Sequence, residues 1–323
     1  MALLELKDLH TFFTTKRGIV KAVNGVSYSV EAGRTLGVVG ESGSGKSVSA
    51  MSILQLLDGN GYIDSGSIMF DGRELTKLSR TDMYKIRGND ISVIFQEPMT
   101  SLNPVFRIGD QIEEVLLLHR SGSDQDVKER TIELLQMVGI ANAEGVYKMF
   151  PHELSGGMRQ RVMIAMALAC NPSILIADEP TTALDVTIQA QVLDMITDLM
   201  HRNNTALLLI THNLGIVAEM CDYVAVVYGG EIVEYGSKRE VFKNPCHPYT
   251  IGLFGAVPSM QSAGQRLKPI DGVMPDPSDL PAGCKFHTRC PYATDACSEG
   301  NVPVVDLGGT HRCQCHNIEA VRA

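Results

Sequence analysis

Apolar and polar residues along this chain fall into two kinds of pattern, one typical of strands and the other of helices. Short alternations at residues 3–13 and 26–30 suit edge or antiparallel strands, in which every second side chain faces the core. Short apolar runs predict further, more buried strands at residues 35–39, 67–70, 91–95, 174–177, 206–210 and 223–227. Apolar residues at helical spacing predict helices at residues 46 to about 57, 108–119, 127–138 and 187–200.

The order of these elements predicts the fold class and a division into domains. Strands alternate with helices, which implies a parallel sheet covered by helices, and a mainly helical insert interrupts the alternation. We expect an α/β core at residues 1–97 and 161–245, with antiparallel strands at its edge, and a helical subdomain at 98–160. Residues 246–323 form a small irregular extension, because recurrent prolines leave little periodic apolar sequence there.

Composition narrows the class of protein. The chain has 323 residues, of which 44% are hydrophobic and 20% charged, an ordinary balance for a globular protein. No apolar run reaches the ~18–20 residues that cross a bilayer, and the N-terminus lacks the basic and apolar stretches of an export signal. If this protein works at a membrane, other chains must supply the membrane-spanning part.

The formal net charge of -9 argues against one class of partner. Broad electrostatic binding to a nucleic-acid backbone requires a basic surface, so no nucleic-acid partner is expected. An excess of acidic residues is instead typical of a soluble protein.

Residues 40–47, Gly-Glu-Ser-Gly-Ser-Gly-Lys-Ser, match the P-loop pattern for binding nucleotide phosphates. Glycines let backbone N–H groups approach the phosphates closely, and the N-terminus of the following helix adds partial positive charge. Lys46 is expected to neutralise the β and γ phosphates, and the Ser47 hydroxyl to bind Mg²⁺. A glycine-rich turn that matches by chance is the alternative, but a strand is predicted before the motif and a helix after it.

A second acidic motif follows the apolar run at 174–177. Asp178 and Glu179 stand at the carboxyl end of a predicted buried strand, where open α/β sheets bind their ligands. We expect Asp178 to hold Mg²⁺ and Glu179 to act as the general base on the attacking water. A solvated acidic turn is the alternative.

A second glycine motif, Leu-Ser-Gly-Gly-Met-Arg-Gln at residues 154–160, precedes another predicted helix. Ser155 could simply cap this helix, or the helix start could bind an anion. Together with the P-loop, this motif resembles the ATPase subunits of ABC transporters.

The resemblance implies a role for each matching residue. It implies ATP contacts from Phe13, Gly40, Ser42, Gly43, Ser44, Gly45, Lys46, Ser47 and Val48. It implies Mg²⁺ binding by Ser47, Gln96 and Asp178, and catalytic roles for Lys46, Gln96, Glu179 and His212. It also implies a head-to-tail dimer in which the partner's ATP is contacted by Ser155, Gly156, Gly157 and Asp185, the last following Ala183 and Leu184. Phe12 competes with Phe13 for the adenine-stacking position, and a core role for Phe13 is also open.

Two further segments resemble the oligopeptide/dipeptide importer branch of this family. These are Gln-Glu-Pro-Met-Thr-Ser-Leu-Asn-Pro at residues 96–104 and Asn-Pro-Cys-His-Pro-Tyr-Thr at residues 244–250. The resemblance implies an ATPase at the cytoplasmic face of the membrane that powers import of di- or oligopeptides. The implied partners are two membrane permease subunits, a second ATPase subunit that is often non-identical, and, indirectly, an extracytoplasmic peptide-binding protein. Nickel and glutathione importers share these motifs, and a soluble ABC protein of DNA repair or translation is the alternative of another class.

Five of the eight cysteines lie in the last forty residues. In a chain without an export signal, such a cluster suggests metal more than disulfides. Relatives carry a [4Fe-4S] cluster here, and the resemblance implies that its ligands are Cys284, Cys290, Cys297 and Cys315, with Cys313 as the alternative to Cys315. Zinc bound by cysteines together with His287, His311 or His316 is the rival, and unliganded thiols are the third possibility. Cys170 and Cys221 lie in apolar surroundings and are expected to be buried thiols.

Overall fold

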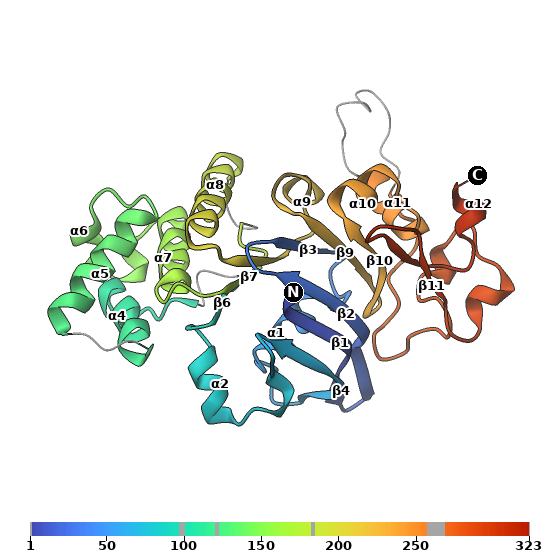
Figure 1. Ribbon diagram of the computed structural model, residues 1–323, viewed down its shortest axis with the longest axis horizontal. Helices are drawn as coiled ribbons and strands as arrows, with labels where there is room; N and C mark the ends of the chain where they lie inside the picture. The colour runs from blue at the N-terminus through green and yellow to red at the C-terminus, as the bar shows by residue number, and fades with distance from the viewer. Residues whose placement is uncertain (1, 97–100, 120–122, 182–184, 257–268, 323) are drawn as a thin grey trace. The chain divides into compact units, whose positions relative to one another are not determined.

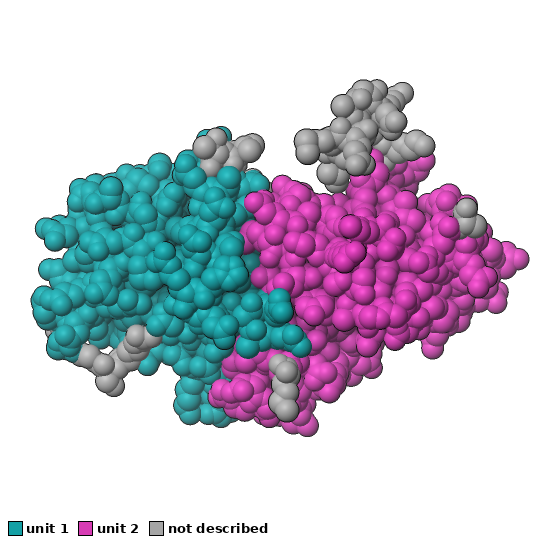
Figure 2. Space-filling model, turned by 45° about the horizontal axis from the view of Figure 1, so that its top comes forward, with its two compact units in different colours: residues 1, 31–34, 78–209 teal, residues 2–30, 35–77, 210–323 magenta. Residues whose placement is uncertain are grey.

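The computed structural model describes residues 2–96, 101–119, 123–181, 185–256 and 269–322 (Figure 1). The chain divides into two compact units (Figure 2). Unit 1 contains residues 31–34 and 78–209, and unit 2 contains residues 2–30, 35–77 and 210–323. The domain boundaries expected from the sequence stay a prediction. Within the described residues, no helix has both the length and the apolar character needed to cross a membrane.

Unit 2 contains the strand that leads into the P-loop. Strand β3 (Thr35–Val39) is buried along its whole length and pairs in parallel with β9 (Tyr223–Tyr228). Both were predicted from their apolar runs, which is the composition expected of strands covered on both faces. The order continues from β9 to the antiparallel β10 (Glu231–Ser237), and then to β12 (Arg312–Gln314) and β11 (Val304–Asp306).

A separate antiparallel sheet in unit 2 has the strand order β2-β1-β4-β5. Its strands are β1 (Ala2–Thr15), β2 (Gly18–Glu31), β4 (Gly61–Phe70) and β5 (Arg73–Glu74). In β1, Leu4 and Leu6 are buried in alternation, and a register shift after Lys7 then brings Leu9 and Thr11 inward. The alternation at residues 3–13 therefore did predict a half-buried strand, but not its irregularity.

Helix α1 (Lys46–Ile53) follows the P-loop and ends four residues earlier than its apolar pattern predicts. Gln55 adopts a left-handed backbone conformation, with φ of 50°, which a continuing helix does not allow. Its side-chain Nε2 donates a hydrogen bond to the carbonyl of Leu75, 2.7 Å away, at the start of the short 3₁₀ turn η1 (Leu75–Lys77). A contact between distant residues thus ends the helix.

Unit 1 holds three neighbouring strands in the order β8-β7-β6, namely β8 (Ala206–Ile210), β7 (Ile174–Asp178) and β6 (Ile91–Ile94). β6 and β7 run parallel. Its helices are α2 (Arg80–Ile86), α4 (Ile108–His119), α5 (Asp124–Met137), α6 (Ala143–Tyr147), α7 (Gly156–Leu168) and α8 (Val186–Asn203). A 3₁₀ turn, η2 (Pro151–Glu153), precedes α7.

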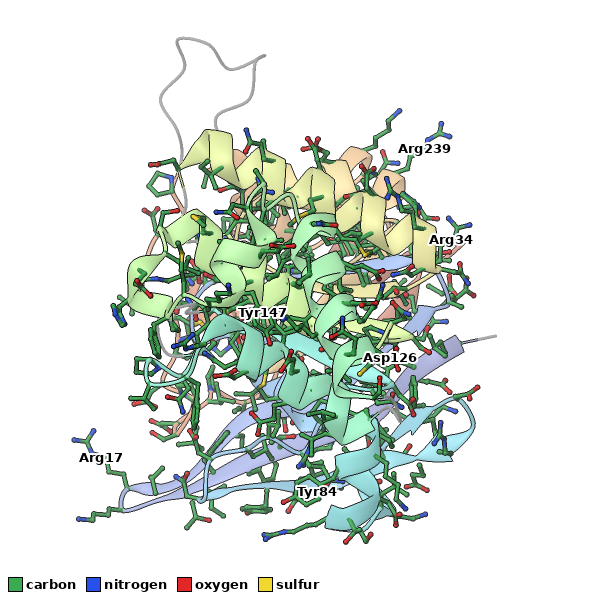
Figure 3. All side chains as sticks on the ribbon, turned by 90° about the vertical axis from the view of Figure 1, so that its left-hand side faces the viewer. Arg17, Arg34, Tyr84, Asp126, Tyr147 and Arg239 are labelled. Atoms are coloured by element: carbon green, nitrogen blue, oxygen red, sulfur yellow. The ribbon has the colours of Figure 1, made fainter. Side chains whose placement is uncertain are left out.

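The helical segment of unit 1 is held by caps and by side-chain contacts between helices. Asp126, labelled in Figure 3, completes a capping box with Ser123, so α5 begins before the predicted residue 127. Tyr147, also labelled there, donates a hydrogen bond from α6 to Glu113 of α4 at 2.7 Å. Cys170, after α7, is buried as predicted.

The C-terminal region of unit 2 has short elements joined by turns. They are α9 (Leu214–Met220), α10 (Lys238–Lys243), α11 (Pro248–Gly255), η4 (His287–Arg289), η5 (Asp295–Ser298) and α12 (Ile318–Arg322). Cys246, Cys313, Cys315 and Ile318 form a small buried cluster, against which Val305 and Leu307 pack. Cys221, after α9, is also buried as predicted.

Candidate functional site

The P-loop connects β3 to the N-terminus of α1. The residue that precedes α1, Gly45, has a φ of 101° and makes no side-chain cap, so the helix start is shaped by backbone alone. A Cβ at Gly45 would overlap the carbonyl oxygen of Ala22, and one at Gly40 would overlap that of Val227. These two positions accept only glycine, which keeps the backbone at the surface that a phosphate would approach.

Lys46 is the best-fixed charged group of the loop. Its side chain is buried, and its Nζ donates to the carbonyls of Gly40 and Glu41, both at 2.8 Å, and to Ser44 Oγ at 3.4 Å. The ammonium is thus held within the loop by the loop's own oxygens. Ser42 and Gly43 are exposed, while Ser47 and Val48 are partly buried.

In unit 1 the structure brings Gln96 and Glu179 together. Gln96 follows β6 and donates from Nε2 to Glu179 Oε2 at 3.2 Å. Glu179, after β7, has a φ of 48°, and such a left-handed conformation in a residue other than glycine is uncommon and concentrates at functional sites. Asp178 before it is buried at the carboxyl end of the strand. Residues 97–100 lie outside the described part of the chain.

The second glycine motif forms the start of α7. Ser155 caps the helix, and its Oγ accepts a hydrogen bond from Met158 N at 3.4 Å. Ser155 and Gly156 are exposed, and a Cβ at Gly156 would meet nothing within 4 Å. Asp185 is also exposed, at the residue before α8. Ala183 and Leu184, expected in the same loop, lie outside the described residues.

The remaining predicted nucleotide contacts lie in unit 2. Phe13 pairs with Gly61 across β1 and β4, and its ring lies beside that glycine. Phe12 packs edge-on against Tyr62, with a ring-centroid distance of 6.2 Å. His212 follows β8 and is exposed. Neither position decides which phenylalanine stacks on adenine, and the assignment of Phe13 stays a prediction.

Four of the five C-terminal cysteines line one small cavity. It is lined by Cys284, Cys290, Cys297, Cys315, His247, Pro248, Phe286, His287, Tyr292, His316 and Asn317. Burial, and secondarily the other cysteines nearby, raises the pKa of Cys284 to about 11. Cys313 is not among the residues that line this cavity and belongs to the cluster around Ile318.

Two of the three histidines that line the cavity differ in their hydrogen bonding. His287 Nδ1 lies 2.8 Å from the carbonyl oxygen of Cys284. His316 Nε2 is buried and has no hydrogen-bond partner among the described residues. A buried polar atom of this kind is costly unless something else satisfies it.

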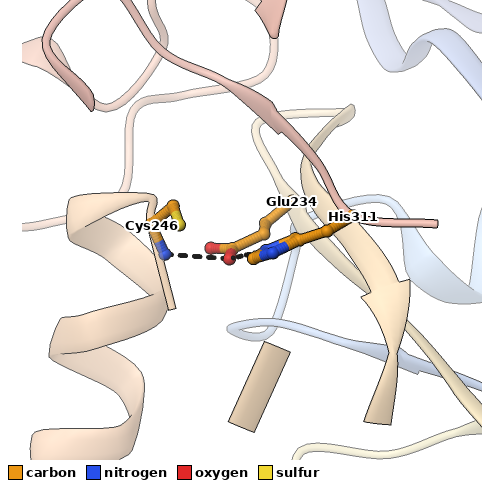
Figure 4. A group of neighbouring side chains, drawn as sticks. All are labelled: Glu234, Cys246 and His311. Carbon is orange, nitrogen blue, oxygen red and sulfur yellow. Dashed lines mark hydrogen bonds and ion pairs between the residues drawn. The ribbon is translucent and has the colours of Figure 1, made fainter. Parts of the chain in front are cut away.

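A buried group outside the cavity consists of Glu234, Cys246 and His311 (Figure 4). Glu234 Oε1 accepts hydrogen bonds from His311 Nε2 at 2.8 Å and from Cys246 N at 2.9 Å, and Oε2 accepts one from His247 N at 2.9 Å. The three side chains are close enough to hold a metal ion, but these bonds already satisfy the carboxylate. His311, one of the zinc candidates, therefore lies here and not at the cavity. The sequence signal that was overlooked is a glutamate, Glu234, directly between the apolar residues Val233 and Tyr235 of β10.

Comparisons with known proteins identify the families that this chain matches. Residues 23–182 match the family model described as "ABC transporter", and residues 233–297 match "Oligopeptide/dipeptide transporter, C-terminal region". The chain is 50% identical to the oligopeptide transport ATP-binding protein AppD of Bacillus subtilis, with 98% of each chain covered. It is 51% identical to the oligopeptide transport ATP-binding protein OppD of Escherichia coli, with 92% of this chain and 88% of that protein covered.

A solved structure is similar to the chain in fold. The dimeric post-hydrolysis state of the ATP-binding cassette MJ0796, bound to ADP and Pi, has a TM-score of 0.66 and 26% identity. The match covers 73% of this chain and 99% of that one. The α/β fold class predicted from the sequence is thereby confirmed.

Proposed function

Because this chain belongs to the family of ATP-binding subunits of oligopeptide ABC transporters, we propose that it hydrolyses ATP to power peptide import through partner permeases. The observation that carries the proposal is the pair of glycine-rich helix starts. The start of α1 is shaped by the P-loop of the same chain, and the start of α7 at Ser155 is exposed. The solved relative with ADP and Pi is a dimer, which is the assembly that such a pair of helix starts would need.

The P-loop would supply phosphate binding. Backbone N–H groups around Gly45 and the ammonium of Lys46 would compensate the charge of the β and γ phosphates. Phe13 would stack on the adenine. Ser47, Gln96 and Asp178 offer the hydroxyl, amide and carboxylate oxygens that Mg²⁺ prefers, and the bound ion would neutralise further phosphate charge. Lys46 and Ser47 belong to unit 2, whereas Gln96 and Asp178 belong to unit 1. We propose that groups of both units act on one nucleotide.

Glu179 would act as the general base. A base needs to be oriented before it removes a proton from water, and the hydrogen bond from Gln96 restrains the carboxylate of Glu179. His212 would contact the γ phosphate. Catalysis would then consist of positioning and charge stabilisation, with no covalent intermediate.

The exposed helix start at Ser155 would complete the site of a second ATPase subunit. Ser155, Gly156 and Gly157 would direct backbone N–H groups at a partner's γ phosphate, and Asp185 would lie beside them. The partner could be another copy of this chain or a related ATPase.

The direct test is co-expression with the permease subunits and the second ATPase. We expect the chain to co-purify with them at the cytoplasmic face of the membrane, and ATP hydrolysis to rise when a peptide-loaded binding protein is added. Stimulation by nickel or glutathione with their binding proteins, but not by peptide, would favour those importers. Association with nucleic acid and not with permeases would contradict the proposal.

We further propose that the cavity holds a [4Fe-4S] cluster on Cys284, Cys290, Cys297 and Cys315. The lining offers four sulfurs and no carboxylate among the described residues, a donor set that suits iron–sulfur or zinc. Burial raises the pKa of the Cys290 and Cys315 thiols, so a cation would be needed to keep them as thiolates. When bound, the cluster would crosslink the turns of the C-terminal region.

Metal analysis of anaerobically purified protein would test this. Four irons and four acid-labile sulfides per chain are expected, and Cys315→Ser should abolish them while Cys313→Ser should not. One zinc per chain without sulfide would show that the cavity binds zinc and not the cluster. Metal-free protein would show that the cysteines are unliganded thiols.

A further inference from the structure

Glu41 is a P-loop residue that the C-terminal region contacts. Its carboxylate accepts two hydrogen bonds from Arg289, Nη1 to Oε2 at 2.7 Å and Nη2 to Oε1 at 3.2 Å. Such a bidentate pair fixes the orientation of a carboxylate as well as its position. The side chain of Arg289 is only 5% exposed, whereas that of Glu41 is 32% exposed. The arginine is therefore the buried, fixed half of the pair.

Arg289 is itself anchored within the C-terminal region. Its Nε donates to the carbonyl of Asp271 at 2.9 Å, and its Nη1 donates to Tyr228 Oη at 3.3 Å. The guanidinium also lies over the rings of Tyr228 and Phe286, each 5.8 Å from the ring centroid. Contacts on several sides leave the arginine little rotamer freedom, so it can serve as a support for the loop.

A second residue of the C-terminal region holds the backbone of Glu41. The N–H of Glu41 donates to Tyr249 Oη at 2.7 Å. Tyr249 is fully buried, and its ring packs against Tyr228 with a centroid distance of 4.6 Å. On the other side of the same residue, Lys46 Nζ donates to the carbonyl of Glu41. The side chain, the N–H and the carbonyl of Glu41 are thus all engaged at once.

We propose that Arg289 and Tyr249 are positioning residues for nucleotide binding, through which the C-terminal region sets the conformation of the P-loop. Neither needs to touch ATP, since both act through Glu41. The phosphate-binding lysine is bonded to the same residue, so a shift of Glu41 displaces Lys46 as well. The proposal rests on the proposed function, because it assumes that the P-loop binds ATP.

The arrangement also connects the P-loop to the cysteine cavity. Arg289 immediately precedes Cys290, and Phe286 lies both under the guanidinium and in the cavity lining. An interaction that orders the turns around the cavity would therefore also order the Arg289 guanidinium, which holds Glu41. Two segments that are remote in sequence would in this way act as one structural unit.

The test is ATP binding by the full chain, measured by titration calorimetry for Arg289→Met, Glu41→Gln and the double variant. Each single change should raise Kd about tenfold, equivalent to about 1.4 kcal/mol. The double variant should lose no more than the weaker-binding single variant, because both changes remove the same pair. Arg289→Lys, which keeps the charge but not the fork, should recover part of the affinity.

Controls separate this effect from loss of folding. Arg312→Met changes an exposed arginine of the same region and should leave Kd unchanged. If Arg289→Met does not fold, Glu41→Gln, on the partly exposed side of the pair, still reports on it. Unchanged Kd in a folded single variant, or additive losses in the double variant, would overturn the inference. Failure of the wild-type chain to bind ATP would instead refute the proposed function.

Discussion

The two glycine-rich helix starts of this chain are built in opposite ways. At the start of α1, Gly45 provides no side-chain cap, and the loop before it is fixed by buried groups such as Lys46. At the start of α7, Ser155 caps the helix by itself, and both Ser155 and Gly156 are exposed. The first is held in shape by distant parts of its own unit. The second has a side-chain cap of its own, and one turn later Arg159 Nε donates to the carbonyl of Pro151 at 2.8 Å.

This difference indicates a division of labour. A loop that is held in one conformation by contacts with other parts of its own unit can bind a ligand in a single chain, because little conformational entropy is lost on binding. An exposed helix start can bind an anion that another molecule presents to it. Changes at the two sites should therefore separate binding from hydrolysis.

The largest effect is expected from Glu179→Gln. Loss of the general base should lower the rate of ATP hydrolysis by about 10²–10⁴-fold, the range typical of such catalysis. ATP binding by the chain should be retained, since the P-loop is unchanged. Phosphate release and titration calorimetry measure the two properties, with Glu129→Gln, an exposed glutamate of α5, as the matched control. Equal loss of binding would show that Glu179 also supports nucleotide binding and does not act in hydrolysis alone.

The next effect is expected from Gly156→Asp. A side chain fits there, because a Cβ would meet nothing within 4 Å, and an acidic residue in the first turn of a helix is stabilising. The chain should therefore fold and bind ATP normally. Hydrolysis in the assembled transporter should fall on the order of 10²-fold, because the added carboxylate would repel the partner's phosphate that this helix start is proposed to bind.

The neutral variant Gly156→Asn isolates the charge. It should fold equally well and lose much less activity than Gly156→Asp. If both variants hydrolyse ATP at the wild-type rate in the assembled transporter, the exposed helix start has no part in the reaction.

Sequence patterns predicted what local chemistry determines. The runs at residues 35–39 and 206–210 became β3 and β8 with the expected bounds, because strands buried on both faces must be continuously apolar. Helix α4 spans the predicted residues 108–119. The hydrogen bond between Gln96 and Glu179 joins two residues that were singled out separately.

Sequence patterns missed what depends on contacts between distant residues. Glu41 and Arg289 are 248 positions apart, and no periodicity marks either as a member of a pair. Glu234 lies between Val233 and Tyr235, which was a usable sign of a buried carboxylate with a partner, but the identity of His311 as that partner requires the fold. Helix α1 ended early for the same reason, since Gln55 bonds to a residue of another element.

The smallest effect is expected from Tyr249→Phe, which removes a single hydroxyl from the support of the P-loop. The ring and its packing remain, and only the acceptor for the Glu41 N–H is lost. Because the Arg289 pair is intact, we expect Kd for ATP to rise only about threefold, less than one factor of ten in affinity. Tyr84→Phe, in which the lost hydroxyl belongs to an exposed side chain of α2, is the control and should leave Kd unchanged.

An effect of Tyr249→Phe as large as that of Arg289→Met would mean that the backbone contact, and not the ion pair, holds the loop. No effect at all would show that the Tyr249 hydroxyl has no part in holding Glu41 for nucleotide binding.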